Sequence, residues 1–219
     1  MLRDHLLDAL AVLLPADCPA CGLPATRTPC PDCARALAAE AHCTVRRLGP
    51  AGDPLDVVVG APYSGVTRRL LLGLKEEGRV AAVRPLGALL RPALLRALDG
   101  APAALVGPPG SWSRRLRRGL DPLELLVRSA GGRLERPLAR TRLARDQVGL
   151  GRAERSANLD GAFRARRAMD GVEPVLLVDD VVTSGATLLE LRRAVRAAGG
   201  AVRGAAALAG TRHRGSASS

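Results

Sequence analysis

The chain has 219 residues, 47% of them hydrophobic, which suffices for one well-buried α/β domain and a small appendage. The formal net charge of +12 comes almost entirely from arginine, and Tyr63, Trp112 and Phe163 are the only aromatic residues. This charge suits an anionic partner, although a GC-rich coding sequence would also produce an arginine surplus. The aromatic stacking platforms that many single-strand nucleic-acid binders use are missing.

The first fifteen residues predict one amphipathic helix, with leucines at positions 2, 6, 10, 13 and 14. Asp4, His5 and Asp8 interrupt this stretch, so no apolar run of signal-peptide length forms. No run elsewhere approaches the length of a membrane span. We therefore expect a cytoplasmic protein with no membrane partner.

Two C-x-x-C pairs follow, with eight residues between them. Their members are Cys18, Cys21, Cys30 and Cys33. Four thiolates on two tight turns can surround one Zn²⁺ ion. A segment this short also needs such a cross-link to fold, because it has no core of its own. Two disulfides are the alternative, but they suit an exported protein. A single C-x-x-C pair could be a redox motif, but the presence of two such pairs argues against it. We predict a structural zinc site, in which His42 could replace a ligand, and a buried or spare thiol at Cys43.

Apolar periodicity, prolines and glycines predict the elements of the main domain. Residues 46–54 are predicted to be a linker, and a short strand follows at 55–59. Helices are expected at 64–74 and 80–98, and the prolines of the second helix are expected to kink or break it. A further short apolar strand is expected at 103–106.

A cationic loop after this strand carries four arginines within five positions. They are Arg114, Arg115, Arg117 and Arg118. A solvated loop is the simpler interpretation of such a charge run. We favour a pyrophosphate-binding loop, because guanidinium groups bind phosphate bidentately. The next helix has a clear start, with Asp121 as N-cap, Pro122 at the first position and Glu124 at capping-box spacing.

The most informative stretch is 174–187, which reads PVLLVDDVVTSGAT. Its four aliphatic residues at 175–178 predict a strand buried on both faces of a parallel sheet. Asp179 and Asp180 come directly after them and are expected at the strand's carboxyl end, where open α/β sheets bind ligands. A turn rich in hydroxyls then leads into a helix, and 201–209 predict another strand.

These residue types suit a sugar phosphate. Amides at a helix N-terminus, with the hydroxyls of Thr183, Ser184 and Thr187, can hold a phosphate, and Gly185 lets the backbone come close. Adjacent carboxylates can accept hydrogen bonds from two neighbouring sugar hydroxyls. An ordinary capped helix would leave the two acids unexplained. A Walker-B strand would need a loop ending in Gly-Lys-Ser/Thr, and the only lysine, Lys75, has no such context.

At every position this stretch resembles the phosphoribosyl diphosphate (PRPP) motif of type I phosphoribosyltransferases. The resemblance implies that the acidic pair binds the ribose 2′ and 3′ hydroxyls and that the following loop wraps the 5′-phosphate. The implied PRPP-binding residues are Asp179, Asp180, Val181, Val182, Thr183, Ser184, Gly185, Ala186 and Thr187.

Nearly the whole chain resembles the ComF family, the competence protein F-like phosphoribosyltransferases. The resemblance rests on the cysteine pairs, Leu74-Lys75, Arg118-Gly119, a polar run at 140–163 and the PRPP motif, in this order. The polar run is also long for a plain connection, so we expect a functional loop there.

The implied fold is α/β, a type I phosphoribosyltransferase-like parallel sheet flanked by helices after a small N-terminal zinc-binding segment. The expected division is 1–45 for the helix and zinc segment, 46–210 for the phosphoribosyltransferase-like domain and 211–219 for a disordered tail.

The resemblance implies transfer of phosphoribosyl from PRPP to a nitrogen acceptor, with pyrophosphate release and a possible link to DNA uptake. Magnesium on the diphosphate and loop arginines are expected to stabilise the charge that develops, and no general base is assigned. The alternative is a non-catalytic PRPP sensor whose zinc segment and basic surface hold single-stranded DNA or a protein such as a DNA-uptake helicase.

Overall fold

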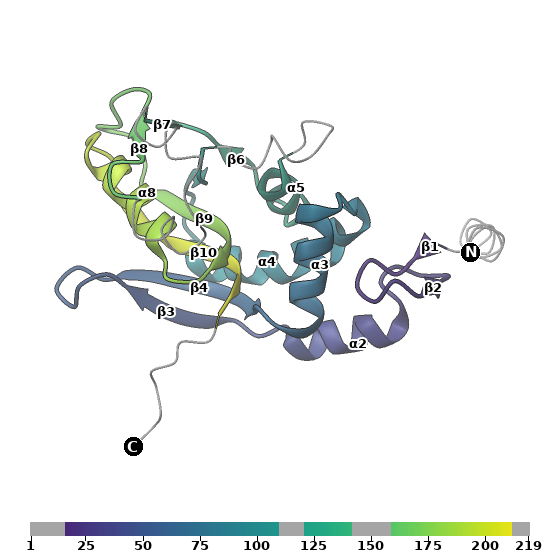
Figure 1. Cartoon of the computed structure of the whole chain (residues 1–219). Coiled ribbons are helices and arrows are strands. Elements are labelled where there is room, and N and C mark those ends of the chain that lie inside the picture. Colours follow the sequence, from purple (N-terminus) through teal and green to yellow (C-terminus); the bar gives the residue numbers. More distant parts are fainter. Residues whose placement is uncertain (1–15, 110–120, 142–158, 212–219) are drawn as a thin grey trace, which may run out of the picture.

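The computed structural model describes residues 16–109, 121–141 and 159–211 of the chain (Figure 1). Its centre is a six-stranded sheet with the order β3-β4-β10-β9-β5-β6. The strands are β3 (Thr44–Leu48), β4 (Leu55–Pro62), β5 (Leu105–Val106), β6 (Leu134–Glu135), β9 (Val175–Val182) and β10 (Val202–Gly210). All neighbouring pairs are parallel except β3 with β4, which is antiparallel.

Helices cover both faces of this sheet. One face carries α3 (Gly65–Glu76), the short 3₁₀ helix η1 (Val80–Ala82), α4 (Val83–Leu98) and α5 (Pro122–Ser129). The other face carries α8 (Ala186–Arg196) and a small hairpin of β7 (Leu138–Arg140) and β8 (Phe163–Ala165). The predicted class, an α/β fold with a mainly parallel sheet flanked by helices, is confirmed.

The aliphatic run of β9 fills both cores, as its sequence predicts. Leu176 and Val178 pack in the core under α3, α4 and α5, whereas Val175 and Leu177 pack in the core under α8. This alternation follows from the two-residue period of a strand. Small residues in the central strands let helices approach closely. A Cβ at Gly60, for example, would lie 2.3 Å from the carbonyl oxygen of Leu89 in α4.

The described N-terminal part forms a small separate segment beside α3 (Figure 1). It consists of β1 (Ala16–Asp17), β2 (Pro24–Ala25) and α2 (Pro31–Glu40), and it contains all four cysteines of the two pairs. The predicted small cysteine-containing appendage is therefore confirmed. The predicted helix of residues 1–15 and the tail after Thr211 lie outside the described residues.

The predicted linker at 46–54 is wrong for its first three residues. Residues 46–48 belong to β3, which pairs along its whole length with β4. Prolines and glycines begin only at Gly49, and two arginines are compatible with a strand at the edge of a sheet. The sheet therefore begins at Thr44, two residues before the predicted domain boundary.

Within the described ranges, no helix combines the length and the apolar character that crossing a membrane requires.

Candidate functional site

The acidic pair lies where the connections of the sheet change direction. The chain leaves β9 through α8 toward β10, whereas it leaves the neighbouring β5 through α5 toward β6, on the other side. Open α/β sheets bind ligands at the carboxyl ends of strands at such a switch point. Val106, the last residue of β5, pairs with Leu177, so Asp179 and Asp180 extend past the end of β5.

The two aspartates lie inside β9 and not after it, which corrects the expected strand end at Val178. The strand continues to Val182 because β10 runs alongside it, with Asp179 paired to Ala207 and Val182 to Gly210. Among the described strands, only β10 pairs with this acidic half of β9, since β5 ends earlier. The strand tolerates the two carboxylates because Asp179 is partly exposed and Asp180 is paired with a cation.

Lys75, on α3, provides the charge that compensates Asp180. Its Nζ lies 2.7 Å from Asp180 Oδ1, and the two side chains are only 9% and 8% exposed. A buried ion pair is costly to break, because removing one partner leaves the other charge uncompensated. The sequence indicated that Lys75 has no Walker context, but it did not indicate this partner. The pair ties α3 to the acidic half of β9.

Asp179 is held in a less ionised state. Burial of its carboxylate and, next, the charge of Asp180 raise its pKa from 3.8 to about 7, against the opposing charge of Lys75. The backbone amide of Asp180 donates to Asp179 Oδ1 at 2.8 Å, which also opposes the rise in pKa. Near neutral pH the two neighbours therefore differ, with Asp180 paired to a cation and Asp179 close to its titration midpoint.

This raised pKa predicts a pH-dependent effect of Asp179→Asn on stability. Protonation of Asp179 favours the folded state fully below pH 3.8, and that contribution is lost as pH rises to about 7. Asparagine mimics the protonated form at every pH. The stability of the variant relative to wild type should therefore grow by about 2–3 kcal/mol between pH 5 and pH 8, measured by urea unfolding.

Asp53→Asn serves as the control for this pH series. The Arg196 guanidinium lowers the pKa of Asp53, so its stabilising contribution is already present above the ordinary aspartate range and is lost only as pH falls. The effect of Asp53→Asn should therefore stay constant between pH 5 and pH 8. Parallel pH profiles for wild type and Asp179→Asn would contradict the assigned pKa.

Of the predicted phosphate loop at 183–187, residues 183–185 connect β9 to α8, and Ala186 and Thr187 begin that helix. Gly185 is the N-cap of α8 and has a φ of +81°, a conformation that favours glycine. A Cβ there would also lie 2.3 Å from the Leu48 side chain of β3. Thr183 and Ser184 are exposed, and the Ala186 amide donates to Ser184 Oγ at 3.4 Å. Gly185 has no side chain to cap the first-turn amides of α8, which leaves this helix end suited to an anion.

Arg46 is a basic residue of this region that the sequence reasoning missed. Its Nη1 donates to the Val182 carbonyl oxygen at 3.3 Å, across 136 residues of chain. A Cβ at Gly210 would lie 2.8 Å from its guanidinium carbon. Burial lowers the pKa of Arg46, but guanidinium groups stay charged in proteins. A cation therefore lies beside the last residue of β9, on the strand whose Leu48 packs under Gly185.

The expected pyrophosphate loop is described only at its two ends. Arg114, Arg115, Arg117 and Arg118 lie outside the described residues. The loop leaves β5 beside β9, since a Cβ at Gly107 would lie 3.3 Å from the Val178 carbonyl oxygen. At the other end Asp121 caps α5, as predicted, accepting from the amides of Leu123 and Glu124. Most of the expected functional loop at 140–163 also lies outside the described residues.

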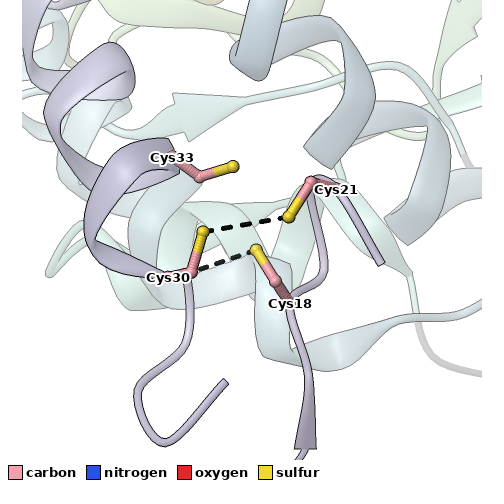
Figure 2. Close-up of side chains that lie close together, drawn as sticks. All are labelled: Cys18, Cys21, Cys30 and Cys33. Atoms are coloured by element: carbon pink, nitrogen blue, oxygen red, sulfur yellow. Dashed lines mark hydrogen bonds between the residues drawn. The ribbon is translucent and has the colours of Figure 1, made fainter. Parts of the chain in front are cut away.

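The four cysteines of the two pairs form a single cluster. Their sulfur atoms all lie within 4.8 Å of one another and are directed toward a common centre (Figure 2). Cys21 Sγ and Cys30 Sγ are 3.8 Å apart. Tetrahedral Zn–S bonds of about 2.3 Å place ligand sulfurs about 3.8 Å apart, so the spacing suits such an ion. The four thiols could hold a metal ion.

Local structure shifts the pKa values of the clustered thiols in opposite directions. Burial of Cys18 opposes ionisation, but hydrogen bonds from the amides of Cys30, Cys21 and Ala20 outweigh it and lower its pKa to about 6. Burial and then the neighbouring thiols raise the pKa of Cys33 to about 12. A metal ion would replace these protons, since it binds thiolates. Among the described residues, Cys43 lies outside the cluster and packs against the main core.

His42 is exposed and is not part of the cluster that the described residues form, so the expectation that it could replace a ligand gains no support.

A separate hollow of about 700 Å³ lies between β8 and α8. Its lining includes Arg164, Arg167 and Asp170, and it reaches Gly199 beyond the C-terminal end of α8. It is therefore distinct from the acidic pair, which lies near the other end of that helix.

Comparison with known proteins gives similarity to solved structures at low sequence identity. No family model matches the chain, and no curated protein matches it. Among solved structures, a similar chain is the orotate phosphoribosyltransferase of Mycobacterium tuberculosis H37Rv, crystallised in complex with Fe(III) dicitrate. The two chains are 17% identical, the alignment covers 82% of this chain and 97% of that chain, and the TM-score is 0.36. A similarity at this level carries no information about the activity of this protein.

Proposed function

We propose that this protein binds PRPP with Mg²⁺ and transfers the phosphoribosyl group to a nitrogen acceptor, releasing pyrophosphate. One observation carries the proposal. A buried strand brings Asp179 and Asp180 to the switch point of an open α/β sheet, directly before a glycine-containing loop at a helix N-terminus. The acids offer acceptors for two ribose hydroxyls, and the loop offers amides and hydroxyls for a phosphate.

Each part of the proposed site acts on a different part of PRPP. Asp179 and Asp180 accept hydrogen bonds from the ribose 2′ and 3′ hydroxyls. The loop at 183–187 surrounds the 5′-phosphate, with Arg46 as an added cation at its edge. The arginines at 114–118 are the proposed ligands of the diphosphate, because their loop starts at Gly107 beside β9.

The reaction breaks the bond between ribose C1 and the diphosphate oxygen, and the acceptor nitrogen forms the new bond to C1. Positive charge develops on the ribose and negative charge on the leaving diphosphate. When bound, Mg²⁺ would neutralise diphosphate charge, and phosphate oxygens would supply most of its ligands. The protein's contribution is to place acceptors at the hydroxyls and cations at the phosphates.

We also propose that Cys18, Cys21, Cys30 and Cys33 bind a structural Zn²⁺ ion. Four thiolates make a closed site, in which no position is left for substrate. The proposed organisation is a zinc segment that ends before β3 at Thr44, a phosphoribosyltransferase-like domain that continues to residue 210, and a tail at 211–219. This organisation would suit a cytoplasmic ComF-type protein that acts in DNA uptake.

Isothermal titration of the wild-type protein with PRPP and Mg²⁺ tests the function. We expect saturable binding, and pyrophosphate release when a panel of bases and amines is added. Arg46→Gln and Arg47→Gln make a matched pair, because Arg47 is exposed and pairs with Asp56 at 3.2 Å, away from Val182. Arg46→Gln should weaken binding about tenfold or more, and Arg47→Gln should leave it unchanged. Wild-type protein that does not bind PRPP would end the proposal.

A non-catalytic PRPP sensor is the second candidate. It is favoured by the net charge of +12 and by the lack of an assigned general base at the acidic pair. In this case PRPP binds but no acceptor in the panel releases pyrophosphate. Binding of single-stranded DNA whose affinity falls steeply with salt would support this candidate further, as would capture of a DNA-uptake helicase.

A further inference from the structure

Helix α3 connects the four-cysteine segment to the acidic pair. Near its C-terminal end Lys75 forms the buried ion pair with Asp180, at 2.7 Å. It packs against η1 and α4 in the main core, and it also contacts the N-terminal segment. The position of this one helix therefore decides whether Lys75 reaches Asp180.

The N-terminus of α3 is capped by a residue from another helix. Ser64, the N-cap residue, makes no side-chain capping hydrogen bond. Instead Glu40, the last residue of α2, accepts from the amides of Val66 and Thr67 at 2.8 and 2.9 Å. It also accepts from the Thr67 hydroxyl at 2.6 Å, and Thr67 is fully buried. A carboxylate with three donors at a helix N-terminus is a strong contact, because both its charge and its two oxygens are used.

The first cysteine turn also lies against α3. Arg69 Nε donates to the Ala20 carbonyl oxygen at 3.1 Å. A Cβ at Gly73 would lie 3.4 Å from the Pro19 carbonyl oxygen. Pro19 and Ala20 are the two residues between Cys18 and Cys21, so the turn that carries two of the thiols rests on the helix.

The second cysteine pair fixes the other half of this contact. Cys30 is the N-cap of α2, and Cys33 lies in its first turn, while Glu40 ends the same helix. A metal ion that joins the four sulfurs would therefore hold together the turn under Arg69 and the helix that ends in Glu40. Both contacts with α3 depend on that arrangement.

We infer that Glu40 is a positioning residue through which the metal-bound cysteine segment holds α3, and with it Lys75, against the acidic pair. Metal occupancy of the cysteine site is then linked to the geometry of the acidic pair. Only the expected effect on PRPP affinity rests on the proposed function. Loss of the metal, or of the Glu40 carboxylate, loosens the Lys75–Asp180 pair.

The chain offers a direct measurement of this pair, because Lys75 is its only lysine. Amine-specific acetylation followed by peptide mass spectrometry reports the accessibility of Lys75, and the N-terminal amine is read on a separate peptide. In wild-type protein loaded with zinc, acetylation of Lys75 should be slow. Glu40→Gln should accelerate it about tenfold while zinc content stays at one ion per chain, and removal of zinc by a chelator should accelerate it further.

Asp32→Asn is the matched control, because Asp32 is an exposed acid on the same helix and forms an ion pair with Arg35. It should leave the acetylation rate unchanged. PRPP affinity, measured on the same variants, should fall about tenfold only for Glu40→Gln. Unchanged acetylation of Lys75 in Glu40→Gln would overturn the inference. Faster acetylation in a protein that never binds PRPP would instead support the linkage and refute the proposed function.

Discussion

Asp180→Asn is expected to weaken PRPP binding by about one to two orders of magnitude. The substitution removes a charged acceptor for a ribose hydroxyl, and hydrogen bonds to charged groups contribute about 1.5–3 kcal/mol each. It also leaves Lys75 as a buried charge without its 2.7 Å partner. The loss of this acceptor alone corresponds to a decrease in affinity of about 10- to 100-fold, measured by isothermal titration with PRPP and Mg²⁺, whereas the unpaired Lys75 lowers the stability of the fold.

The same substitution is expected to destabilise the fold, so its effect on binding needs a second variant. Removing one partner of a buried ion pair costs about 3–5 kcal/mol, whereas replacing both partners by uncharged groups of similar size is often neutral. The double variant Asp180→Asn/Lys75→Met should therefore recover most of the wild-type stability in urea unfolding. It should still bind PRPP as weakly as the single variant Asp180→Asn does.

The comparison of the two variants separates stability from recognition. If the double variant is as stable as wild type and binds PRPP within a few-fold of the wild-type affinity, Asp180 is not a ligand of the sugar. Its ion pair with Lys75 would then be only a structural link between β9 and α3. Weakened binding in a stable double variant would support the assigned role of the carboxylate.

Cys33→Ser is expected to remove the metal and unfold the N-terminal segment. Cys33 is buried on α2, and a serine hydroxyl is a poor substitute for a zinc thiolate. Structural zinc sites contribute about 10–16 kcal/mol of apparent binding free energy in small zinc peptides, which links metal binding to folding. We expect zinc content to fall from one ion per chain to near zero, and limited proteolysis to cleave within residues 16–43.

Cys43→Ser provides the control, since Cys43 lies outside the four-cysteine cluster of the described residues. It should retain one zinc ion and resist proteolysis as wild type does. Mass spectrometry of the intact protein without reductant detects the result that would contradict the zinc site. Two disulfides among the four cysteines, with no zinc, would replace the metal site by the alternative that the cysteine spacing also allowed.

Much of this protein could be predicted from short stretches of its sequence. The aliphatic run at 175–178 predicts a buried strand, and the structure places it in both cores. Asp121 and Pro122 predict the start of α5, and the two cysteine pairs predict the cluster. These features depend on residues near one another in the chain, through side-chain periodicity, helix capping or the ligand spacing that two tight turns impose.

Contacts between distant segments were decided only by the tertiary structure. The sequence did not indicate that Lys75 pairs with Asp180, that Glu40 caps α3 or that Arg46 reaches Val182. Each contact depends on which strands are neighbours and on which face a helix packs. That arrangement results from burying all apolar faces together, so no local pattern of charges specifies it. The sequence determined the chemical groups of the candidate site, and the packing of the sheet and α3 decided their partners.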